Sequence, residues 1–382
     1  MTRFASAALM PLADAVPRLI AGVAPVAERA LPSHAALGFA AAHDVIAERG
    51  WPERPTALRD GWAVQADAVT GASAYAPIPS LAPPVWVEAG EILPEGADTV
   101  LPPEALEGRA IVADAPVGDG VRRWGEDLAA GTRLLAAGTR IAPCHLLTLG
   151  AAGDGSVAVR IPRLALIAAA TPLADALSAL IAREGVELGE RIDAPRTCDG
   201  IAGAIRSARA DAVLVLGGTG PGRTDRAVAA LALAGEVLAH GIALRPGETA
   251  AFGRAGGRPV LLLPGRPEAA LAVFLALGRP LLAALSGVRM PEPEAGTLLR
   301  KVAATIGVSD VVFVRRRADG RSIVPRSVPR FAVESDASTP CLEPLGGADL
   351  ALSHLAEADG AILVPPEREG FPEGTSVGIL PL

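Results

Sequence analysis

A glycine-rich loop is the strongest candidate for a ligand-binding site. Gly217-Gly218-Thr219-Gly220 directly follows the apolar segment Ala212-Val213-Leu214-Val215-Leu216, and Asp225 comes shortly after it. Glycines let backbone N–H groups approach a phosphate, and the N-terminus of a following helix adds positive potential. The spacing is not G-x-G-x-x-G, and the lysine of a P-loop is absent. A simple strand-to-helix turn capped by Asp225 is the alternative reading.

Two further turns carry an arginine beside proline and glycine. Arg245-Pro246-Gly247 follows a short apolar stretch, and Pro264-Gly265-Arg266-Pro267 follows Leu261-Leu262-Leu263. Guanidinium groups bind phosphate through paired hydrogen bonds, and proline stiffens such loops. Proline is equally an ordinary first residue of a helix, and we expect the nearby His240 to be structural. We predict that the three turns lie on one edge of a single sheet and bind a phosphorylated ligand.

Acidic residues gather in turns of an earlier segment. Asp60 precedes the strand-like Gly61-Trp62-Ala63-Val64, Thr99 follows Glu95-Gly96-Ala97-Asp98, and Asp127 ends Gly125-Glu126-Asp127. Carboxylates can orient a hydrated divalent cation or a nucleophile. Solvated turns would explain each acidic segment separately, so both readings stay open.

Composition narrows the class of protein. The chain has 382 residues and a net charge of −7, which argues against broad binding to nucleic acid. Its three cysteines are isolated and form no C-x-x-C pair, which is typical of a reducing compartment. The N-terminal residues reach Pro11 and Asp14 before any long apolar region forms, so we expect a cytoplasmic protein without a membrane partner.

The elements that must position these residues change along the chain. Helical spacing predicts helices near Leu12–Ile20, over 35–48 and over 143–149, and these belong to a helical body of residues 1–48 and 141–161. Residues 49–140 read as an inserted β domain, because prolines and glycines separate short β-type segments. Apolar runs alternate with helical stretches over 162–290, which predicts a parallel sheet covered by helices. Residues 291–382 read as a C-terminal β domain.

Taken in order, these motifs resemble the MoeA-type molybdopterin molybdenumtransferases, the family that includes the gephyrin E domain. The matching segments are Asp60-Gly61-Trp62-Ala63-Val64, Glu88-Ala89-Gly90, Leu93 to Val100, Gly125-Glu126-Asp127, Gly217 to Asp225, His240 to Gly247 and Leu263 to Pro267. The resemblance implies a multidomain α/β plus β protein. Its expected parts are an elongated helical body, an inserted β domain, a MogA-like three-layer α/β domain with a mostly parallel sheet, and a C-terminal β domain.

The resemblance also implies an activity and its residues. Members insert molybdate into molybdopterin, hydrolysing adenylyl-molybdopterin with Mg²⁺ and releasing AMP, as homodimers with a cleft between two subunits. Here Asp60, Asp127 and Asp225 would be catalytic, with Asp225 as a metal ligand and Thr99 donating to molybdate. The expected ligand-binding residues are Gly217, Gly218, Thr219, Gly220, Arg245, Pro246, Pro264, Gly265, Arg266 and Pro267. A MogA-type adenylyltransferase or a client molybdoenzyme is the expected protein partner.

Departures from the family pattern leave two hypotheses open. Where the family has S-T-G-D-E-L, this sequence has Ala168-Ala169-Ala170-Thr171-Pro172-Leu173, and the family's D-S-N turn has no counterpart. One hypothesis is a competent molybdenumtransferase that works with the remaining acids, including Asp193 or Asp199 as replacements. The other is an impaired paralogue that binds molybdopterin or the finished cofactor as a carrier or insertion partner. A dinucleotide or nucleotide-sugar enzyme is disfavoured, because neither standard phosphate motif is present.

Overall fold

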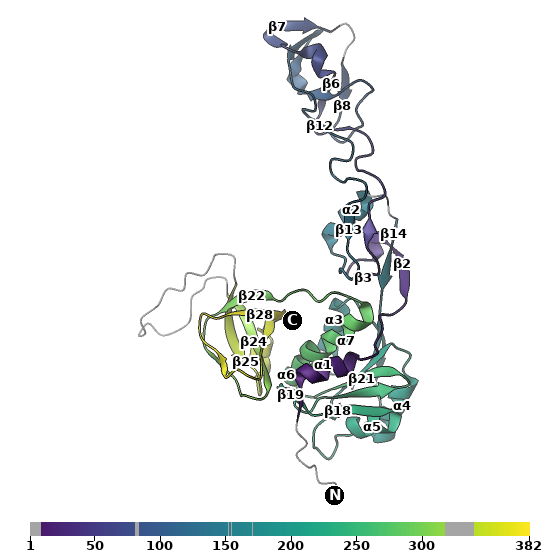
Figure 1. The fold of residues 1–382 in the computed structure, drawn as a ribbon, viewed down its shortest axis with the longest axis vertical. Helices are drawn as coiled ribbons and strands as arrows, with labels where there is room; N and C mark the ends of the chain where they lie inside the picture. The colour runs from purple at the N-terminus through teal and green to yellow at the C-terminus, as the bar shows by residue number, and fades with distance from the viewer. Residues whose placement is uncertain (1–8, 81–83, 152, 154, 170, 318–339) are drawn as a thin grey trace, which may run out of the picture. The chain divides into compact units, whose positions relative to one another are not determined.

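The computed structural model describes residues 9–80, 84–151, 153, 155–169, 171–317 and 340–382. Its contacts divide the chain into two compact units. Unit 1 comprises Met1–Arg29, Gly38–Ala40 and Arg160–Leu382, and unit 2 comprises Ala30–Leu37 and Ala41–Val159. Figure 1 follows the chain through both units by colour. The four-part division by residue number stays a prediction, whereas the mixed α and β content is observed.

A six-stranded sheet forms the centre of unit 1, in the order β16-β15-β17-β21-β20-β18. The first four strands are mutually parallel, and β20 is antiparallel to both of its neighbours, β21 and β18. Their bounds are β15 Arg163–Ile167, β16 Glu187–Ile192, β17 Ala212–Leu216, β18 Glu236–His240, β20 Ala251–Ala255 and β21 Arg258–Leu263. The mostly parallel sheet is therefore confirmed, although β16, β18 and β20 have no apolar run that would have predicted them.

Helices cover both faces of this sheet, which makes three layers (Figure 1). Alternate residues of the strands face opposite cores, as a pleated sheet requires. Leu164 and Leu166 pack with the face covered by α3 and the long helix, whereas Ala165 and Ile167 pack with α4 and α5. The helix bounds are α3 Pro172–Arg183, α4 Cys198–Ser207 and α5 Ala227–Ala234.

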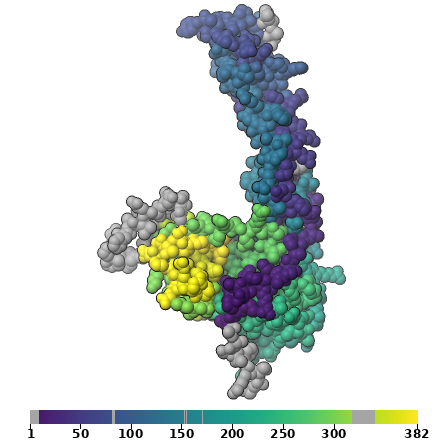
Figure 2. Space-filling model, viewed as in Figure 1, coloured from purple at the N-terminus to yellow at the C-terminus, as the bar shows by residue number. Residues whose placement is uncertain are grey.

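The longest helical stretch, Pro267–Ser286, is a core element. It consists of α6 Pro267–Val273, a π-helical turn Phe274–Gly278 and α7 Arg279–Ser286. Its length and apolar composition would allow it to cross a membrane, but 83% of its most apolar window is buried inside the protein. The N-terminal helix α1 Leu12–Ile20 packs on it through Ala15 and Leu19. In Figure 2 this purple segment lies between the yellow and the teal parts of unit 1.

A second sheet of unit 1 closes on itself. Its order is β1-β19-β24-β25-β22-β28-β26, and β24 also pairs with β26. The bounds are β1 Met10–Pro11, β19 Ile242–Arg245, β22 Glu294–Leu298, β24 Ser309–Arg317, β25 Cys341–Gly346, β26 Gly360–Val364 and β28 Ser376–Pro381, with the small pair β23 Val302–Ala303 and β27 Gly370–Phe371 and the short helix α8 Leu352–Leu355 beside them. The predicted C-terminal β segment thus forms, but β19 and β1 extend its sheet.

Unit 2 contains short strands in small sheets. These are β4 with β13, β5 with β12, β8-β6-β9 and β10-β11-β7, together with most residues of the sheet β2-β14-β3. The bounds are β2 Glu28–Pro32, β3 Ala40–Ala41, β4 Val45–Ile46, β5 Thr56–Ala57, β6 Gly61–Val64, β7 Ser73–Pro79, β8 Val85–Val87, β9 Thr99–Leu101, β10 Leu106–Glu107, β11 Ala110–Ala113, β12 Val121–Arg122, β13 Arg133–Leu135 and β14 Ser156–Arg160. The predicted β texture of this segment is therefore observed.

Two of the three helices predicted for the helical body are observed, and the one over 35–48 is wrong. Leu12–Ile20 and Pro143–Ala151 (α2) are helical, but residues 35–48 contain only the end of a 3-10 turn and the strands β3 and β4. Ala40, Ala41 and Ala42 are buried, and Ala42 N–H donates to the carbonyl of Ala158 at 2.8 Å. Pairing with another strand has overridden the helix preference of alanine, because propensity is weak compared with tertiary packing.

Candidate functional site

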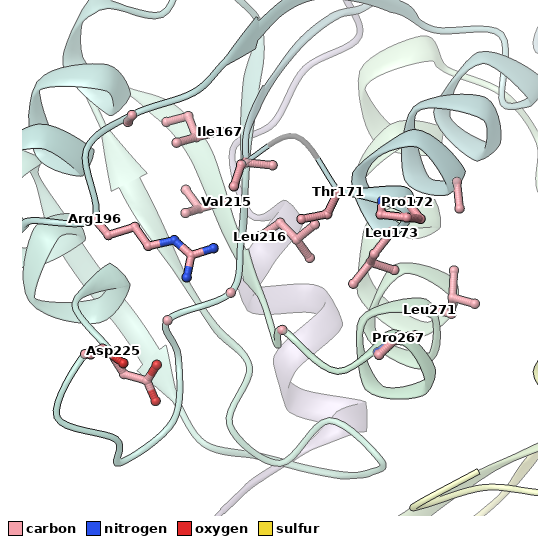
Figure 3. Close-up of a pocket in the computed structure, with 18 of the residues that line it drawn as sticks. Ile167, Thr171, Pro172, Leu173, Arg196, Val215, Leu216, Asp225, Pro267 and Leu271 are labelled. Atoms are coloured by element: carbon pink, nitrogen blue, oxygen red, sulfur yellow. The ribbon is translucent and has the colours of Figure 1, made fainter. Parts of the chain in front are cut away.

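A pocket of about 750 Å³ opens at the carboxyl ends of the parallel strands. Residues that follow β15, β16, β17 and β21 line it, and α8 supplies part of one wall. Ligands bind at this edge in open α/β sheets because the loops there are free to vary. Figure 3 shows the charged side chains of Arg196 and Asp225 on one side of the pocket. Thr171 and the apolar residues Pro172, Leu173, Pro267 and Leu271 lie on the other side, and the strand residues Ile167, Val215 and Leu216 lie between the two groups.

The predicted glycine loop forms the floor of this pocket. Gly217 and Gly218 both line it, with φ angles of +87° and +75°, a conformation that glycine adopts without strain. A Cβ atom built on Gly265 would lie 3.5 Å from the Cα of Gly217, so the loops after β17 and β21 are in contact. Both loops therefore lie on one edge of one sheet, as predicted.

The next part of the loop is held by hydrogen bonds inside the protein. Thr219 is 2% exposed, and its hydroxyl lies 2.9 Å from that of Thr249. The Nε2 atom of His240 lies 3.1 Å from the carbonyl oxygen of Thr219. His240 therefore positions the loop, as expected for a structural histidine, and the Thr219 side chain faces the protein interior.

Asp225 contributes a carboxylate to the pocket without capping a helix. Its Oδ2 accepts a hydrogen bond from the Gly222 N–H at 3.0 Å. Helix α5 begins at Ala227, with Arg226 at the capping position and no capping side chain. The alternative reading of Asp225 as a helix cap is therefore wrong, because its carboxylate closes the loop before the helix starts.

The charged residues of the pocket do not form a magnesium site. Among its described lining residues Asp225 is the only acid, and Arg196 and Arg226 are the charged residues nearest to it in the lining. No group of three or more His, Cys, Asp or Glu side chains in the described part of the chain is arranged to hold a metal ion. Mg²⁺ prefers oxygen ligands, and two guanidinium groups oppose a cation. The pocket is instead suited to an anion.

Comparison with known families identifies the chain. Residues 10–153 match the model described as MoeA N-terminal region (domain I and II), and residues 172–284 match the probable molybdopterin binding domain. The protein named molybdopterin molybdenumtransferase 1 of Mycobacterium tuberculosis is 29% identical over 77% of this chain and 73% of its own length. The chain is a MoeA-type protein. The molybdopterin molybdenumtransferase of Haemophilus influenzae is 28% identical over 53% of this chain and 56% of its own length.

Solved structures agree on the fold of this MoeA-type chain. The crystal structure of the molybdopterin biosynthesis moeA protein from Pyrococcus horikoshii OT3 has a TM-score of 0.72 and 20% identity, covering 98% of this chain and all of that chain. At this identity the likeness concerns the fold alone.

The arginine turn of the MoeA-type chain is not on the same sheet edge as the other two. Arg245 ends β19, which pairs with β24 in the closed sheet, and Arg245 does not line the described pocket. Its Nε and Nη2 donate to the two carboxylate oxygens of Asp310 at 2.7 and 2.8 Å. The prediction that all three turns share one edge is therefore wrong, because β19 joins a different sheet.

The proline loop after β21 is divided between the pocket and the surface beside it. Gly265 and Pro267 line the pocket, whereas Pro264 is buried behind it. Arg266 is paired with Glu268 and Asp349, with 3.3 Å between its Nε and Oε1 of Glu268. Both of its carboxylate partners lie within unit 1, so Arg266 already has its charge neutralised there.

The other predicted site residues belong to unit 2 and have partners there. Asp60 Oδ1 accepts a hydrogen bond from the Ala89 N–H at 2.8 Å, which joins two of the predicted motifs. Asp127 accepts from Arg122 Nη1 at 2.8 Å. Thr99 is fully buried and donates its hydroxyl proton to the carbonyl of Pro116 at 2.6 Å. The expectation that Thr99 donates to molybdate is therefore wrong in this structure, since that proton is already used.

Two charged lining residues were missed by the sequence reasoning. Arg196 follows β16 and Arg226 precedes α5, and both side chains are exposed. Of the alanine segment, Ala168 and Ala169 line the pocket, and Ala170 lies outside the described residues. Asp193 and Asp199 do not line it. In the sequence, only the turn residue Pro195 beside Arg196 indicates that a loop begins here after a strand.

Proposed function

We propose that this chain acts in molybdenum cofactor biosynthesis as a molybdopterin molybdenumtransferase, inserting molybdate into adenylyl-molybdopterin with release of AMP. The observation that carries the proposal is the pocket at the carboxyl edge of the parallel sheet, most of whose lining residues lie in the segment that matches a molybdopterin binding domain. The names of the M. tuberculosis and H. influenzae relatives support the same activity. Molybdopterin and molybdate are then substrates.

The pocket has the surfaces that such a ligand needs. Apolar side chains of Ile167, Val215 and Leu216 provide a floor for a flat ring, because ligand pockets combine apolar area with a few polar groups. Neither Gly217 nor Gly218 carries a side chain that would keep a ligand away, although the Gly217 N–H already donates to the Leu263 carbonyl at 2.8 Å. The pyrophosphate of an adenylate would lie over this turn.

Asp225 is the proposed acid–base group. Its Oδ2 is engaged by Gly222, and its Oδ1 receives no hydrogen bond from the described residues. In the proposed hydrolysis a water oxygen bonds to a phosphorus of the pyrophosphate, the bridging P–O bond breaks, and AMP leaves. Asp225 accepts the proton of the attacking water, a role that typically contributes about 10²–10⁴-fold in rate. No step is assigned to Mg²⁺, which the described pocket residues do not fit.

A second function is favoured by the apolar wall of the pocket. Ala168 and Ala169 stand where the family pattern has Ser and Thr, Thr171 and Pro172 stand where it has two acids, and a single acid lines the described pocket. A protein that binds molybdopterin or the finished cofactor as carrier or insertion partner needs the pocket but not the hydrolysis.

Release of AMP distinguishes the two functions. The purified chain is incubated with adenylyl-molybdopterin and molybdate, with and without Mg²⁺, and AMP is measured. The transferase proposal expects turnover that Asp225→Asn lowers by about 10²-fold or more. The matched control Asp199→Asn removes an acid of α4 that does not line the pocket, and should leave turnover unchanged. Ligand binding without AMP above background selects the carrier function.

The acids of unit 2 and the assembly are further parts of the proposal. We include Asp60 and Asp127 as catalytic residues contributed across a homodimer in the cytoplasm, with an adenylyltransferase or client molybdoenzyme as partner. Mixing Asp60→Asn with Asp225→Asn tests this directly, because heterodimers would regain one intact cleft. Sedimentation of the purified chain as a monomer would contradict the dimer.

A further inference from the structure

Arg196 is one of two cationic side chains of the pocket, with Arg226, to which the proposed function gives no role. It lies in the loop between β16 and α4, is exposed, and lines the pocket. Its guanidinium group makes no hydrogen bond or ion pair with any residue that the structure describes. Figure 3 shows the guanidinium directed into the pocket, between the end of β17 and Asp225.

The backbone around Arg196 is tightly folded. The Thr197 N–H donates to the carbonyl of Pro195 at 2.7 Å, so Arg196 is the central residue of a γ-type turn. Proline fixes one side of this turn, and Thr197 on the other side caps α4 by accepting from the Gly200 N–H at 3.1 Å. A Cβ on Gly200 would lie 2.7 Å from the Pro195 carbonyl oxygen, which shows how close the chain comes to itself. The position of the Arg196 Cα is therefore set before a ligand arrives.

The sheet order brings this loop to the ligand. The end of β16 lies beside the end of β15, with Ile192 paired with Ile167, and β15 lies beside β17. Arg196 thus faces the same space as the glycine loop. Because the described lining carries two arginines and one aspartate, its net charge is positive.

We propose that Arg196 binds the phosphate group of the ligand directly, and that binding in this pocket therefore does not depend on a divalent cation. The proposal rests on the proposed function, because it takes molybdopterin as the ligand. A planar guanidinium donates two parallel hydrogen bonds to phosphate oxygens and neutralises their charge. It supplies the positive charge that a metal held by acids would supply, in a pocket where Thr171 and Pro172 stand in place of the two acids of the family pattern.

Anaerobic binding of molybdopterin to the full chain tests this, measured by quenching of protein fluorescence or by calorimetry. Arg196→Gln should weaken the affinity by about 10- to 100-fold, the range of a charge-assisted hydrogen bond. Arg196→Lys keeps the positive charge but loses the paired hydrogen bonds of the guanidinium group, and should weaken the affinity for molybdopterin by about 3- to 10-fold. The matched control Arg209→Gln removes an exposed arginine just beyond the other end of α4, and should bind as the wild type does.

Two further comparisons identify the contact and the role of metal. Dephosphorylated molybdopterin should bind wild type and Arg196→Gln with equal affinity, because the contact partner is gone. Addition of EDTA or of Mg²⁺ should change the wild-type affinity less than about twofold. Equal binding of molybdopterin by wild type and Arg196→Gln overturns the inference, as does a tenfold loss with EDTA. Absence of binding by the wild type overturns the proposed function itself, and with it the inference.

Discussion

Arg245 and Asp310 are cross-strand neighbours in β19 and β24, joined through two hydrogen bonds of 2.7 and 2.8 Å. The carboxylate side chain is 4% exposed and accepts a third hydrogen bond from the Thr305 N–H at 2.8 Å. This pair holds β19, which follows β18 of the α/β sheet in the chain, against β24 of the closed sheet. An arginine whose motif suggests phosphate binding is therefore a structural residue of unit 1.

Replacing Arg245 should lower stability more than ligand affinity. Arg245→Gln leaves a buried carboxylate with one remaining partner, and because the arginine is 37% exposed we expect a loss of about 2–3 kcal/mol in the free energy of unfolding. Urea unfolding measures this. The matched control Arg316→Gln breaks an exposed pair with Glu294 in the same sheet and should cost below about 1 kcal/mol. If Arg245→Gln bound molybdopterin more weakly and kept the stability of the wild type, Arg245 would be a ligand-binding residue, as first predicted.

Gly218 should not accept a side chain. Its φ of +75° costs a non-glycine residue about 1–2 kcal/mol, and a Cβ there would lie 3.4 Å from the Cβ of Ala227. We expect Gly218→Ala to lower stability by that amount and to weaken ligand binding, because relief of the strained backbone changes the conformation of the loop that lines the pocket. Gly203→Ala is the control, since a Cβ there meets nothing within 4 Å inside α4, and should stabilise by about 0.5–1 kcal/mol. The midpoint temperature of thermal unfolding should therefore fall for Gly218→Ala and rise for Gly203→Ala.

Thr99 should behave as a buried structural residue. Thr99→Val keeps the shape but removes one of two hydrogen bonds to the Pro116 carbonyl, which still accepts from the Asp119 N–H at 3.1 Å, so we expect a cost of about 0.5–1.5 kcal/mol. Thr70→Val removes a hydroxyl that donates to Ala66 at 3.2 Å from an exposed position, and should have little effect. Stability is measured by urea unfolding, and AMP release at saturating molybdate should be unchanged in Thr99→Val. A rise in the molybdate concentration needed for half-maximal turnover would support the original expectation for Thr99.

Some elements could be predicted because a short stretch of the sequence already shows that they are buried. The strand Ala212–Leu216 was predicted with its exact bounds, since a strand buried on both faces is a continuous apolar run. The failed helix over 35–48 shows the opposite case, because alanine fits both a helix and a tightly packed strand. The pairing of β19 with β24 joins residues far apart along the chain, which no local pattern reports.

The site was predictable to a similar degree. The glycine loops could be found because glycine type and spacing follow from backbone conformation, and Gly217, Gly218 and Gly265 all line the pocket. The role of Arg196 in the pocket could not be found in this way, because its position depends on β16 lying beside β15 at the edge of the sheet. Whether an arginine is bound internally, like Arg245, or open to a ligand is decided by neighbours that only the fold supplies.

Glu343 makes the stability of the closed sheet depend on pH. Burial alone would raise the pKa of Glu343, but hydrogen bonds from Arg315 and Arg317 outweigh burial and hold the pKa below its ordinary value of 4.5. Arg317 Nε donates to Oε2 at 2.7 Å and Arg315 Nη2 at 2.6 Å. A lowered pKa in the folded state stabilises the protein above about pH 4.5, and this contribution is lost as the pH falls through the folded value.

Glu343→Gln should remove this dependence. At pH 7 we expect the variant to be about 1–3 kcal/mol less stable than the wild type, since hydrogen bonds to a charged group are lost. As the pH falls below about 4.5 and through the lower pKa of the folded protein, the Glu343 carboxylate of the wild type becomes protonated. The difference in the free energy of unfolding between the two proteins should therefore shrink. Urea unfolding at a series of pH values measures that difference, with Glu294→Gln, an exposed partner of Arg316, as the control. A difference that stays constant down to the acid limit of folding would mean that the pKa of Glu343 is not lowered in the folded protein.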